Sequence, residues 1–450
     1  MNMSIPLWHR LAGRLKRHRH QTTDGAERLR QSVPYGLGSL PLDLDVDYLQ
    51  RLYPKTLGVH PDPKEAIHCA LRNLTGTVSL RSLASPNNPM AIILDWYPGI
   101  TNTVQLVDAV SEALASRDIL GGDVKYIVSS SAGRALSEQL LSEINECQTL
   151  QSSEVLLHNP DRVERHVKIG VSPSIGNEIL VDETVVESEL VVSVSSVMQD
   201  SFAGATGGRM AILPGVSHRQ TIDCNKAQQG IEDTQPFLLH TKSCRDMIEA
   251  SQMAGLMLSV NLVHDQLGNL ASVQAGESEE SWLQSVDEAK QLALTEYTNT
   301  CDVVFVSAGG YPFDSTLYDA IDALFAASSI CRRNGVIVLI AECSDGVGPN
   351  GFSEGVSQSR SQSDALVRIQ TDYREGMEKS RYFWRVLEKH RLVLCSRLRR
   401  AQVEERLYAD AVKDPQEAME IVKNYVGLRP RVALIEYGRM TYPICRHEES

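Results

Sequence analysis

The 450-residue sequence lacks several features that define common classes of protein. It contains no apolar run of about 18 residues, so we expect no membrane-spanning helix. Its nine cysteines lie far apart and include no Cys-x-x-Cys pair, which argues against a disulfide-rich fold and against the usual zinc sites. We therefore expect reduced, mostly buried thiols and a cytoplasmic location.

Basic residues are outnumbered by acidic ones, 44 to 57. The formal net charge is −13, whereas a protein that binds nucleic acid over much of its surface is normally basic, so no nucleic-acid partner is expected. Residues 1–32 are the exception, because His9–His20 is basic and Leu7, Leu11 and Leu15 recur at helical spacing. Two interpretations of this segment stay open: a solvated basic tail, or an amphipathic helix that contacts a membrane surface or a protein. It lacks the apolar stretch of a secretion signal.

The whole chain contains 42% hydrophobic and 22% charged residues, which is the composition of a globular protein. A chain of this length exceeds one ordinary core, so two domains are expected. We place them at residues 33–297 and 298–450, after the basic tail at residues 1–32.

Short apolar strands alternate with helical patterns along the chain, which predicts an α/β fold with mostly parallel sheets and crossover helices. The predicted strands are Ala91–Asp95, Val124–Val128, Glu189–Val197, Leu258–Val263, Cys301–Ser307, Gly335–Ala341, Arg391–Cys395 and Val432–Ile435. Leu270–Val273 is expected to form a hairpin with the fourth of these. Thr241 or Ser243 and Asp414 are predicted helix N-caps, and Ser353–Ser363 is predicted to be a polar loop.

The most glycine-rich stretch, Gly204–Gly215, follows one of these strands. It has neither the Gly-Lys-Ser/Thr of a Walker loop nor the glycine spacing of a dinucleotide fingerprint, so a dehydrogenase is disfavoured. Two interpretations are open: backbone amides that close on an anion or a flat ligand, or a tight turn.

Polar or glycine-rich loops follow four of the predicted strands. They are Asp95–Tyr97, Ser129–Arg134, Gly204–Met210 and Ala308–Pro312. Because the carboxyl ends of parallel strands form the usual ligand site of such sheets, we expect a small ligand in a cleft between the two domains.

The motifs around these loops resemble the nickel-dependent lactate racemase family. Ala203–Gly215 with Thr221, Ile222 and Asn225 is similar to the central motif of that family. Ser307–Tyr318 with Glu342–Gly348 is similar to its C-terminal motif, and Pro34–Gly36 to its entry motif. The resemblance covers about residues 33–450.

This resemblance implies a two-domain α/β protein that holds a nickel-pincer nucleotide, a pyridinium-derived cofactor with sulfur and carbon donors to nickel. In the family, a lysine anchors the cofactor, one histidine binds the metal, and two histidines act as acid and base while a hydride moves between 2-hydroxy acid and cofactor. By the resemblance, the cofactor-binding positions in this sequence are Asp95, Gly204, Gly207, Gly208, Arg209, Gly309, Gly310 and Tyr318.

The positions that carry the chemistry of the family hold other residues here. Met210 stands in place of the anchoring lysine, and a thioether has no amine for the covalent link. Lys226 stands in place of the metal-binding histidine, and an ammonium has no lone pair for nickel. One acid–base histidine corresponds to Asp200 and the other to Ala132 or Gly133.

Two further cationic positions are changed. An arginine of the family corresponds to Pro98, and its Tyr-Gln-x-x-Lys is Tyr318-Asp319-Ala-Ile-Asp322 here. Asp319 and Asp322 add negative charge, which we expect to repel a carboxylate or phosphate ligand. Asp200 and Lys226 could form a new acid–base pair or a structural salt bridge.

We therefore interpret the sequence as a diverged, lactate racemase-like protein that has lost the anchoring lysine and the catalytic histidines. No catalytic residue and no metal ligand is assigned, and His158, His166, His218 and His264 are expected to be structural. The cofactor is unknown, and covalent attachment is not expected with Met210 in the lysine position. The alternative is an active racemase or epimerase of 2-hydroxy acids that works by hydride transfer with a non-covalently held nickel-pincer or other nucleotide cofactor.

Overall fold

The computed structural model describes residues 22–56, 62–76, 89–95, 103–116, 124–129, 142 and 144–446. They divide into two compact units. The terminal unit takes its described residues from Met1–Lys55, Gly230–Asp233 and Leu292–Ser450, and the central unit takes them from Thr56–Gln229 and Thr234–Gln291. Among the described residues, no helix is long and apolar enough to cross a membrane.

The central unit is built on a six-stranded sheet with the order β12-β11-β8-β3-β4-β5. Its strands are β3 (Met90–Asp95), β4 (Val124–Val128), β5 (Glu154–Leu157), β8 (Leu190–Val197), β11 (Leu256–His264) and β12 (Leu270–Glu277). Neighbouring strands are parallel except β12, which pairs antiparallel with β11.

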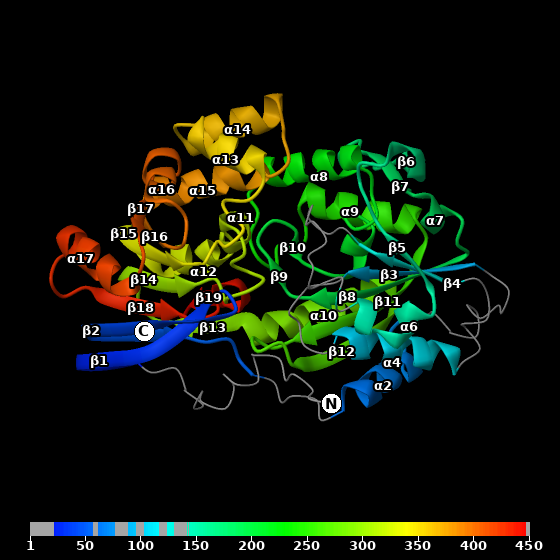
Figure 1. Ribbon diagram of the computed structural model, residues 1–450, viewed down its shortest axis with the longest axis horizontal. Helices are drawn as coiled ribbons and strands as arrows, with labels where there is room; N and C mark the ends of the chain where they lie inside the picture. Colours follow the sequence, from blue (N-terminus) through cyan, green and yellow to red (C-terminus); the bar gives the residue numbers. More distant parts are fainter. Residues whose placement is uncertain are drawn as a thin grey trace. The chain divides into compact units, whose positions relative to one another are not determined.

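Both faces of this sheet are covered, because every residue of β3 and β8 is buried. Ile92 and Val192 face a core shared with α2 (Pro63–Arg72) and α4 (Thr103–Ala115). Ile93 and Val191 face a second core, which includes the short helix η3 (Gly208–Ala211) and α9 (Lys242–Met253). Figure 1 shows α2 and α4 on one side of the sheet and α9 on the other. The continuous apolar strands therefore reflect burial on two sides.

The remaining elements of the central unit connect these strands. They are α6 (Gln148–Gln151), η2 (Val163–Arg165), β6 (His166–Val171), β7 (Glu178–Asp182), α7 (Glu183–Val186), β9 (Gln199–Asp200), β10 (Gly204–Ala205), α8 (Arg219–Ile231) and α10 (Ser278–Ala293), the last two ending in the terminal unit. Strands β6 and β7 form an antiparallel pair of their own.

The terminal unit contains a seven-stranded sheet with the order β1-β2-β18-β14-β15-β16-β17. The strands are β1 (Thr22–Tyr35), β2 (Gly38–Leu52), β14 (Cys301–Ser307), β15 (Cys331–Ile340), β16 (Arg391–Cys395), β17 (Asp410–Val412) and β18 (Arg431–Ile435). All neighbours are parallel except β1 and β2, which form a hairpin. Strands β13 (Leu294–Tyr297) and β19 (Tyr442–Cys445) pair separately.

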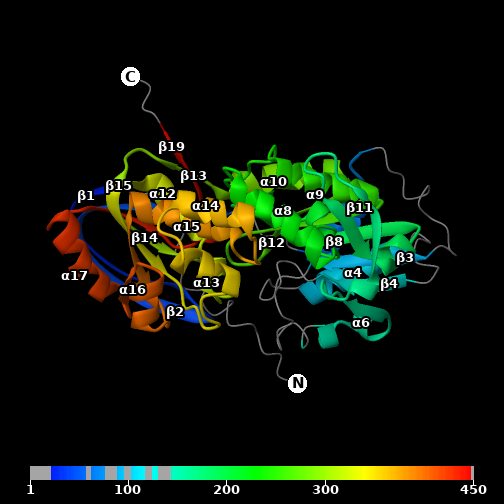
Figure 2. The ribbon, with the colours of Figure 1, turned by 90° about the horizontal axis from the view of Figure 1, so that it is seen from above.

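Helices from the second half of the chain surround this sheet (Figure 2). They are α11 (Leu317–Ala320), α12 (Ala323–Ile330), α13 (Asn350–Ser357), α14 (Gln362–Thr371), α15 (Glu378–Lys389), α16 (Arg400–Arg406), α17 (Pro415–Val426) and the short helix η4 (Gly438–Met440). Apolar residues of β2, β14, β15 and α17 share one core.

The predicted α/β class with mostly parallel sheets is confirmed, and so are two N-caps. Thr241 accepts a hydrogen bond from the amide of Cys244, and Asp414 accepts one from the amide of Glu417. The predicted polar loop at Ser353–Ser363 is wrong, because it contains the end of α13 and the start of α14. There, Ser361 caps α14 by accepting a hydrogen bond from the amide of Asp364.

The two units differ from the predicted ranges, because the terminal unit also takes in Gly230–Asp233, the residues from Leu292 and the strands near the start of the chain. Residues 22–32, predicted as part of the tail, belong to β1, and residues 33–52 pair with the sheet of the terminal unit. The physical reason is the alternation of Leu42, Leu44 and Val46, which bury one face of β2 against that sheet. Residues 1–21, and with them the proposed amphipathic helix, lie outside the described residues.

Candidate functional site

The carboxyl edge of the central sheet carries polar side chains at four strand ends. Asp95 ends β3, Ser129 follows β4, His158 follows β5 and His264 ends β11. Asp95 is buried and accepts a hydrogen bond from Ser129 Oγ at 3.3 Å. Of the predicted loops, Trp96–Tyr97 and Ser130–Arg134 lie outside the described residues, and so do Pro98, Ala132 and Gly133.

Asp200 follows β8 and precedes the glycine-rich loop. Its Oδ1 accepts hydrogen bonds from the amides of Phe202 (2.9 Å) and Ala203 (2.7 Å). The carboxylate therefore stabilises the turn that leads into β10, a role that needs an acceptor and would suit asparagine as well.

The paired glycines follow, each with a positive φ. A Cβ on Gly207 would lie 2.5 Å from Val197 Cγ2, and one on Gly208 would lie 2.8 Å from the ring of Trp282. Gly204 approaches the carbonyl oxygen of Leu238 in the same way. Close packing within the central unit thus accounts for these glycines, which favours the tight-turn interpretation of this loop.

Arg209 is the one charged side chain of η3, and it is buried at 3% exposure. Its Nη2 donates to the carbonyl oxygen of Ala203 at 2.8 Å and lies 3.3 Å from Cys244 Sγ, while its guanidinium stacks 3.8 Å above Trp282. Nε and Nη1 have no hydrogen-bond partner among the described residues. Burial lowers the pKa of Arg209. A buried guanidinium with two unused donors is suited to an anionic ligand.

By the resemblance, Met210 and Lys226 correspond to the cofactor-anchoring and metal-binding positions of the family. Met210 is buried in the apolar core with Ala211, Ile212 and Ile222. Lys226 is buried on α8. Among the described residues, no group of three or more His, Cys, Asp or Glu side chains could hold a metal ion. These residues do not fit an amine-anchored, histidine-ligated nickel cofactor.

In the terminal unit, the entry motif and the C-terminal motif lie together. The amide of Gly36 donates to Asp314 Oδ2 at 2.7 Å, and the amide of Glu342 donates to the same oxygen at 3.0 Å. Gly310 packs against Gly36, whose carbonyl oxygen a Cβ would approach to 2.9 Å, and Gly309 follows the end of β14 with a φ of 116°. Asp314 therefore joins three segments that are far apart in the sequence.

Tyr318 is buried on α11, and burial raises its pKa well above the ordinary value, with a further contribution from Glu378. Its hydroxyl donates to Glu378 Oε1, while Tyr373 donates to Oε2 of the same carboxylate at 2.7 Å. Lys379 Nζ lies 4.3 Å from the centre of the Tyr318 ring and donates to the Tyr318 carbonyl oxygen at 3.0 Å.

Asp322 is not an isolated negative charge. Its Oδ2 lies 3.2 Å from Lys379 Nζ and forms an ion pair with Arg439, and all three side chains are buried. Asp319 accepts a hydrogen bond from Thr316 Oγ1 at 2.7 Å near the start of α11. The expected repulsion of anions by Asp322 is therefore offset by two cations from distant parts of the chain, which the sequence motif does not reveal.

A second glycine pattern, Gly346-Val-Gly348-Pro-Asn-Gly351, has the spacing of a dinucleotide fingerprint. It precedes α13, but packing accounts for two of its glycines. A Cβ on Gly348 would lie 2.5 Å from Tyr318 Cβ, and one on Gly351 would lie 2.3 Å from the carbonyl oxygen of Glu375. The second of these contacts is with backbone, which leaves no space for a side chain at Gly351.

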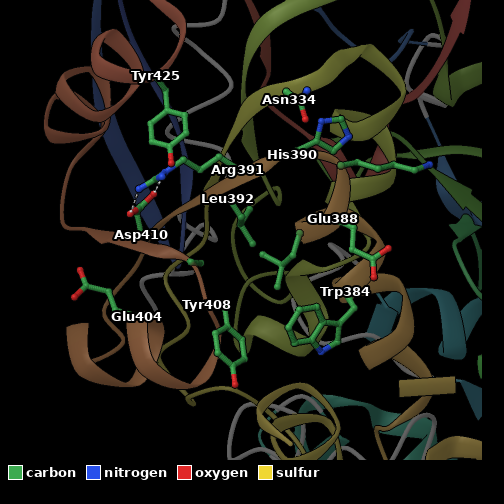
Figure 3. A pocket seen from close by; sticks show the side chains of 13 residues that line it. Asn334, Trp384, Glu388, His390, Arg391, Leu392, Glu404, Tyr408, Asp410 and Tyr425 are labelled. Carbon is green, nitrogen blue, oxygen red and sulfur yellow. Dashed lines mark hydrogen bonds and ion pairs between the residues drawn. The ribbon is translucent and has the colours of Figure 1, made fainter. Parts of the chain in front are cut away.

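A groove of about 780 Å³ in the terminal unit contains none of the predicted site residues. Figure 3 shows its lining, in which Arg391 pairs with Asp410 and stacks on Tyr425, and Trp384 lies beside Tyr408. The groove lies between α15, α16 and α17, and none of its lining residues belongs to a glycine-rich motif.

His264 is a polar side chain that needs a separate explanation. It is 4% exposed, neither ring nitrogen has a hydrogen-bond partner among the described residues, and burial lowers its pKa to about 4. In the sequence, the only sign that His264 could belong to a site is that it directly follows a predicted strand, since ligands often bind at the carboxyl ends of parallel strands.

Family models of known proteins match most of the chain. The model described as "Lactate racemase N-terminal domain" matches residues 35–235, and that described as "Lactate racemase C-terminal domain" matches residues 297–440. The lactate racemase of Thermoanaerobacterium thermosaccharolyticum is 26% identical over 422 residues, which cover 90% of this chain and 97% of that protein. The lactate racemase of Lactiplantibacillus plantarum is 24% identical over 419 residues, with coverage of 90% and 97%.

Solved structures show the same fold. The lactate racemase apoprotein from T. thermosaccharolyticum superposes with a TM-score of 0.80 at 24% identity, covering 92% of this chain and 100% of that one. A crystal structure of a Thermotoga maritima protein gives a TM-score of 0.63 at 11% identity, covering 87% and 100%.

Proposed function

Because this chain belongs to the lactate racemase family, we propose that it is a diverged member that binds a small ligand without holding a nickel-pincer nucleotide covalently. The observation that carries the proposal is the burial of Met210 in the apolar core, where the resemblance places the anchoring lysine. A thioether has no amine with which to form the covalent link.

The metal position supports the same proposal. Lys226 stands where the resemblance places the nickel ligand, and a protonated amine has no lone pair to donate. Asp200, at one acid–base position, accepts two backbone amides and so stabilises the loop. A carboxylate held in this way is poorly placed to exchange a proton with a ligand.

The ligand of this proposal is a small anion. Arg209 has two nitrogens, Nε and Nη1, that lack a hydrogen-bond partner among the described residues of the central unit. A carboxylate or phosphate group matches such donors. A cytoplasmic location belongs to the proposal too, because all nine cysteines are free thiols, as expected in a reducing compartment.

The second candidate is an active racemase or epimerase of 2-hydroxy acids with a non-covalent nucleotide cofactor. Tyr318 favours it, because the resemblance makes this tyrosine a site residue and Glu378 holds its hydroxyl in one direction. Its raised pKa keeps the hydroxyl protonated, and because that proton is donated to Glu378, the hydroxyl oxygen would accept a hydrogen bond from a ligand.

Intact mass and metal content separate the two candidates. We expect that the full chain, produced together with the proteins that make the nickel-pincer nucleotide, has the mass of its sequence and no stoichiometric nickel. The T. thermosaccharolyticum lactate racemase, produced in the same cells, is the positive control. Stoichiometric nickel or a nucleotide-derived chromophore in this chain would overturn the proposal, and racemisation of lactate by that preparation would establish the second candidate.

Replacing Met210 by lysine tests whether position 210 lies in an apolar environment. We expect Met210→Lys to lower the free energy of unfolding by at least about 2 kcal/mol, because the new amine would be buried without a partner. Met210→Leu is the matched control, with an expected loss below about 1.5 kcal/mol. Urea denaturation measures both. An unchanged stability of the lysine variant would mean that position 210 opens onto solvent or a polar cavity.

A further inference from the structure

Three histidines of the central unit form a cluster that the glycine-rich motifs do not include. His158 follows β5, His166 begins β6 and His218 precedes α8. The Nε2 atoms of His158 and His166 are 3.0 Å apart. The ring centres of His166 and His218 are 5.1 Å apart, and those of His158 and His166 are 5.2 Å apart. His158 is buried, whereas His166 and His218 are partly exposed.

Neighbouring backbone groups fix the proton positions on two of these rings. His166 Nδ1 lies 2.7 Å from the carbonyl oxygen of Arg162, which can only accept, so Nδ1 carries the proton. The neutral ring then has its lone pair on Nε2, the atom that faces His158. His218 Nδ1 accepts from the amide of Gln220 at 3.2 Å, so its lone pair is already used.

Burial disfavours the charged form of two of the three imidazoles, those of His158 and His218. Burial, and then His166, lower the pKa of His158 to about 3, and burial lowers that of His218. The nearby carboxylates are paired with arginines: Asp182 with Arg165 at 3.3 Å, and Asp161 with Arg219 at 3.0 Å. A metal ion binds imidazole only in its neutral form.

We propose that His158 and His166 bind a divalent transition-metal ion, such as Zn²⁺ or Cu²⁺, through their Nε2 atoms. Two imidazole nitrogens that occupy adjacent positions on such an ion, each about 2.0–2.1 Å from it, lie roughly 2.9–3.4 Å apart. The observed 3.0 Å falls within that interval. The Arg162 carbonyl is the kind of partner that orients a metal-binding histidine by its other ring nitrogen.

Water completes the coordination, because no group of three or more His, Cys, Asp or Glu side chains is arranged around a metal position in the described part of the chain. In the metal-free protein, His158 Nε2–H donates to His166 Nε2. On binding, His158 takes the tautomer with its proton on Nδ1, which frees Nε2 for the ion without net proton release. The site does not depend on the proposed function, since it shares no residue with the glycine-rich loops.

Metal titration of the full chain tests this site. His9, His18 and His20 of the basic segment can bind metal themselves, so H9Q/H18Q/H20Q is the background for every measurement. We expect one Zn²⁺ per chain by isothermal titration and, with Cu²⁺, an electron paramagnetic resonance spectrum of two imidazole nitrogens. H166Q is expected to weaken binding at least tenfold, whereas H240Q, which changes the exposed His240, leaves it unchanged.

A simple N–H···N hydrogen bond between the two rings is the opposing interpretation. Equal Zn²⁺ affinity in the background, H166Q and H158Q/H166Q would overturn the metal site, and so would the absence of any stoichiometric binding. Because H158Q removes a buried side chain, the half-exposed His166 carries the main test. Circular dichroism confirms that H166Q is folded, and Zn²⁺ is expected to raise the unfolding midpoint of the background protein but not that of H166Q. Neither readout requires the nickel-pincer nucleotide, so failure here is distinct from failure of the proposed function.

Discussion

An ion-paired cluster of the terminal unit differs from two buried side chains of the central unit in how its polar atoms are paired. In the terminal unit, Asp322 is paired with Lys379 and Arg439, and Glu378 accepts from two tyrosines. In the central unit, Arg209 has two nitrogens, and His264 both ring nitrogens, without a hydrogen-bond partner among the described residues. A buried charge that is paired with an opposite charge stabilises the fold, whereas a buried polar group without a hydrogen-bond partner can still bind a ligand. The comparison thus contrasts an ion-paired cluster of the terminal unit with two buried side chains of the central unit whose nitrogens lack a hydrogen-bond partner among the described residues.

The largest effect is expected at Asp322. Asp322→Ala would leave Lys379 and Arg439 buried without their shared anion, so the free energy of unfolding should fall by about 3–5 kcal/mol. Urea denaturation followed by circular dichroism measures this loss. Asp345→Ala, at an exposed position in the same unit, is the control and should change nothing measurable. A loss below 1 kcal/mol, roughly that of an exposed pair, would remove the contrast between the units.

A smaller, pH-dependent effect is expected at His264. Its pKa in the folded protein, about 4, lies below the ordinary value near 6.5, so the unfolded chain binds more protons between these values and stability falls as the pH falls. Between pH 7 and pH 5, the stability difference between the wild type and His264→Leu should shift by about 2 kcal/mol against the wild type.

His158, whose pKa is lowered in the same direction, is present in both proteins and so cancels in this comparison. Denaturant unfolding at a series of pH values gives the difference directly. Parallel pH profiles of the two proteins would show that His264 gains a partner or solvent in the folded state.

The smallest effect is expected at Arg209. Arg209→Met loses the hydrogen bonds to the Ala203 carbonyl oxygen and to Cys244 Sγ, and the stack on Trp282. It also removes a guanidinium that is buried with two unused nitrogens, so we expect a change of only about 1 kcal/mol. Binding of a small carboxylate or phosphate to the variant should be weakened by far more, and titration calorimetry measures it. The exposed Arg245→Met is the control. A stability loss of 3 kcal/mol or more would mean that Arg209, like Asp322, mainly stabilises the fold.

Most of the sheet framework could be predicted from the sequence, because its strands are continuous runs of apolar and β-branched residues. Val124–Val128, Cys301–Ser307 and Arg391–Cys395 have the predicted bounds. The β1–β2 hairpin was missed although Leu42, Leu44 and Val46 alternate with polar residues, the pattern of a strand buried on one side. The helix start at Ser361 was missed because its serine-rich surroundings resemble a loop.

The candidate site was less predictable, because charge compensation depends on residues that are distant in the sequence. The motif comparison identified Asp322 as a negative charge, yet Lys379 lies 57 positions further along the chain. Nothing in the local sequence links His158 to His166 and His218, which were expected to be structural. Glycine positions, in contrast, followed from the motifs, because backbone conformation and close packing are local requirements.

The pairing of β2 with β18 has a consequence for biosynthesis. Tyr48 pairs with Arg431, and Leu52 with Ile435, so β1 and β2 are translated at the start of the chain, whereas the neighbouring strand β18 is translated close to the end. All six strands of the central sheet lie between Met90 and Glu277 and are complete much earlier. On the ribosome, the central sheet can therefore fold before β18, the strand that pairs with β2, has been synthesised.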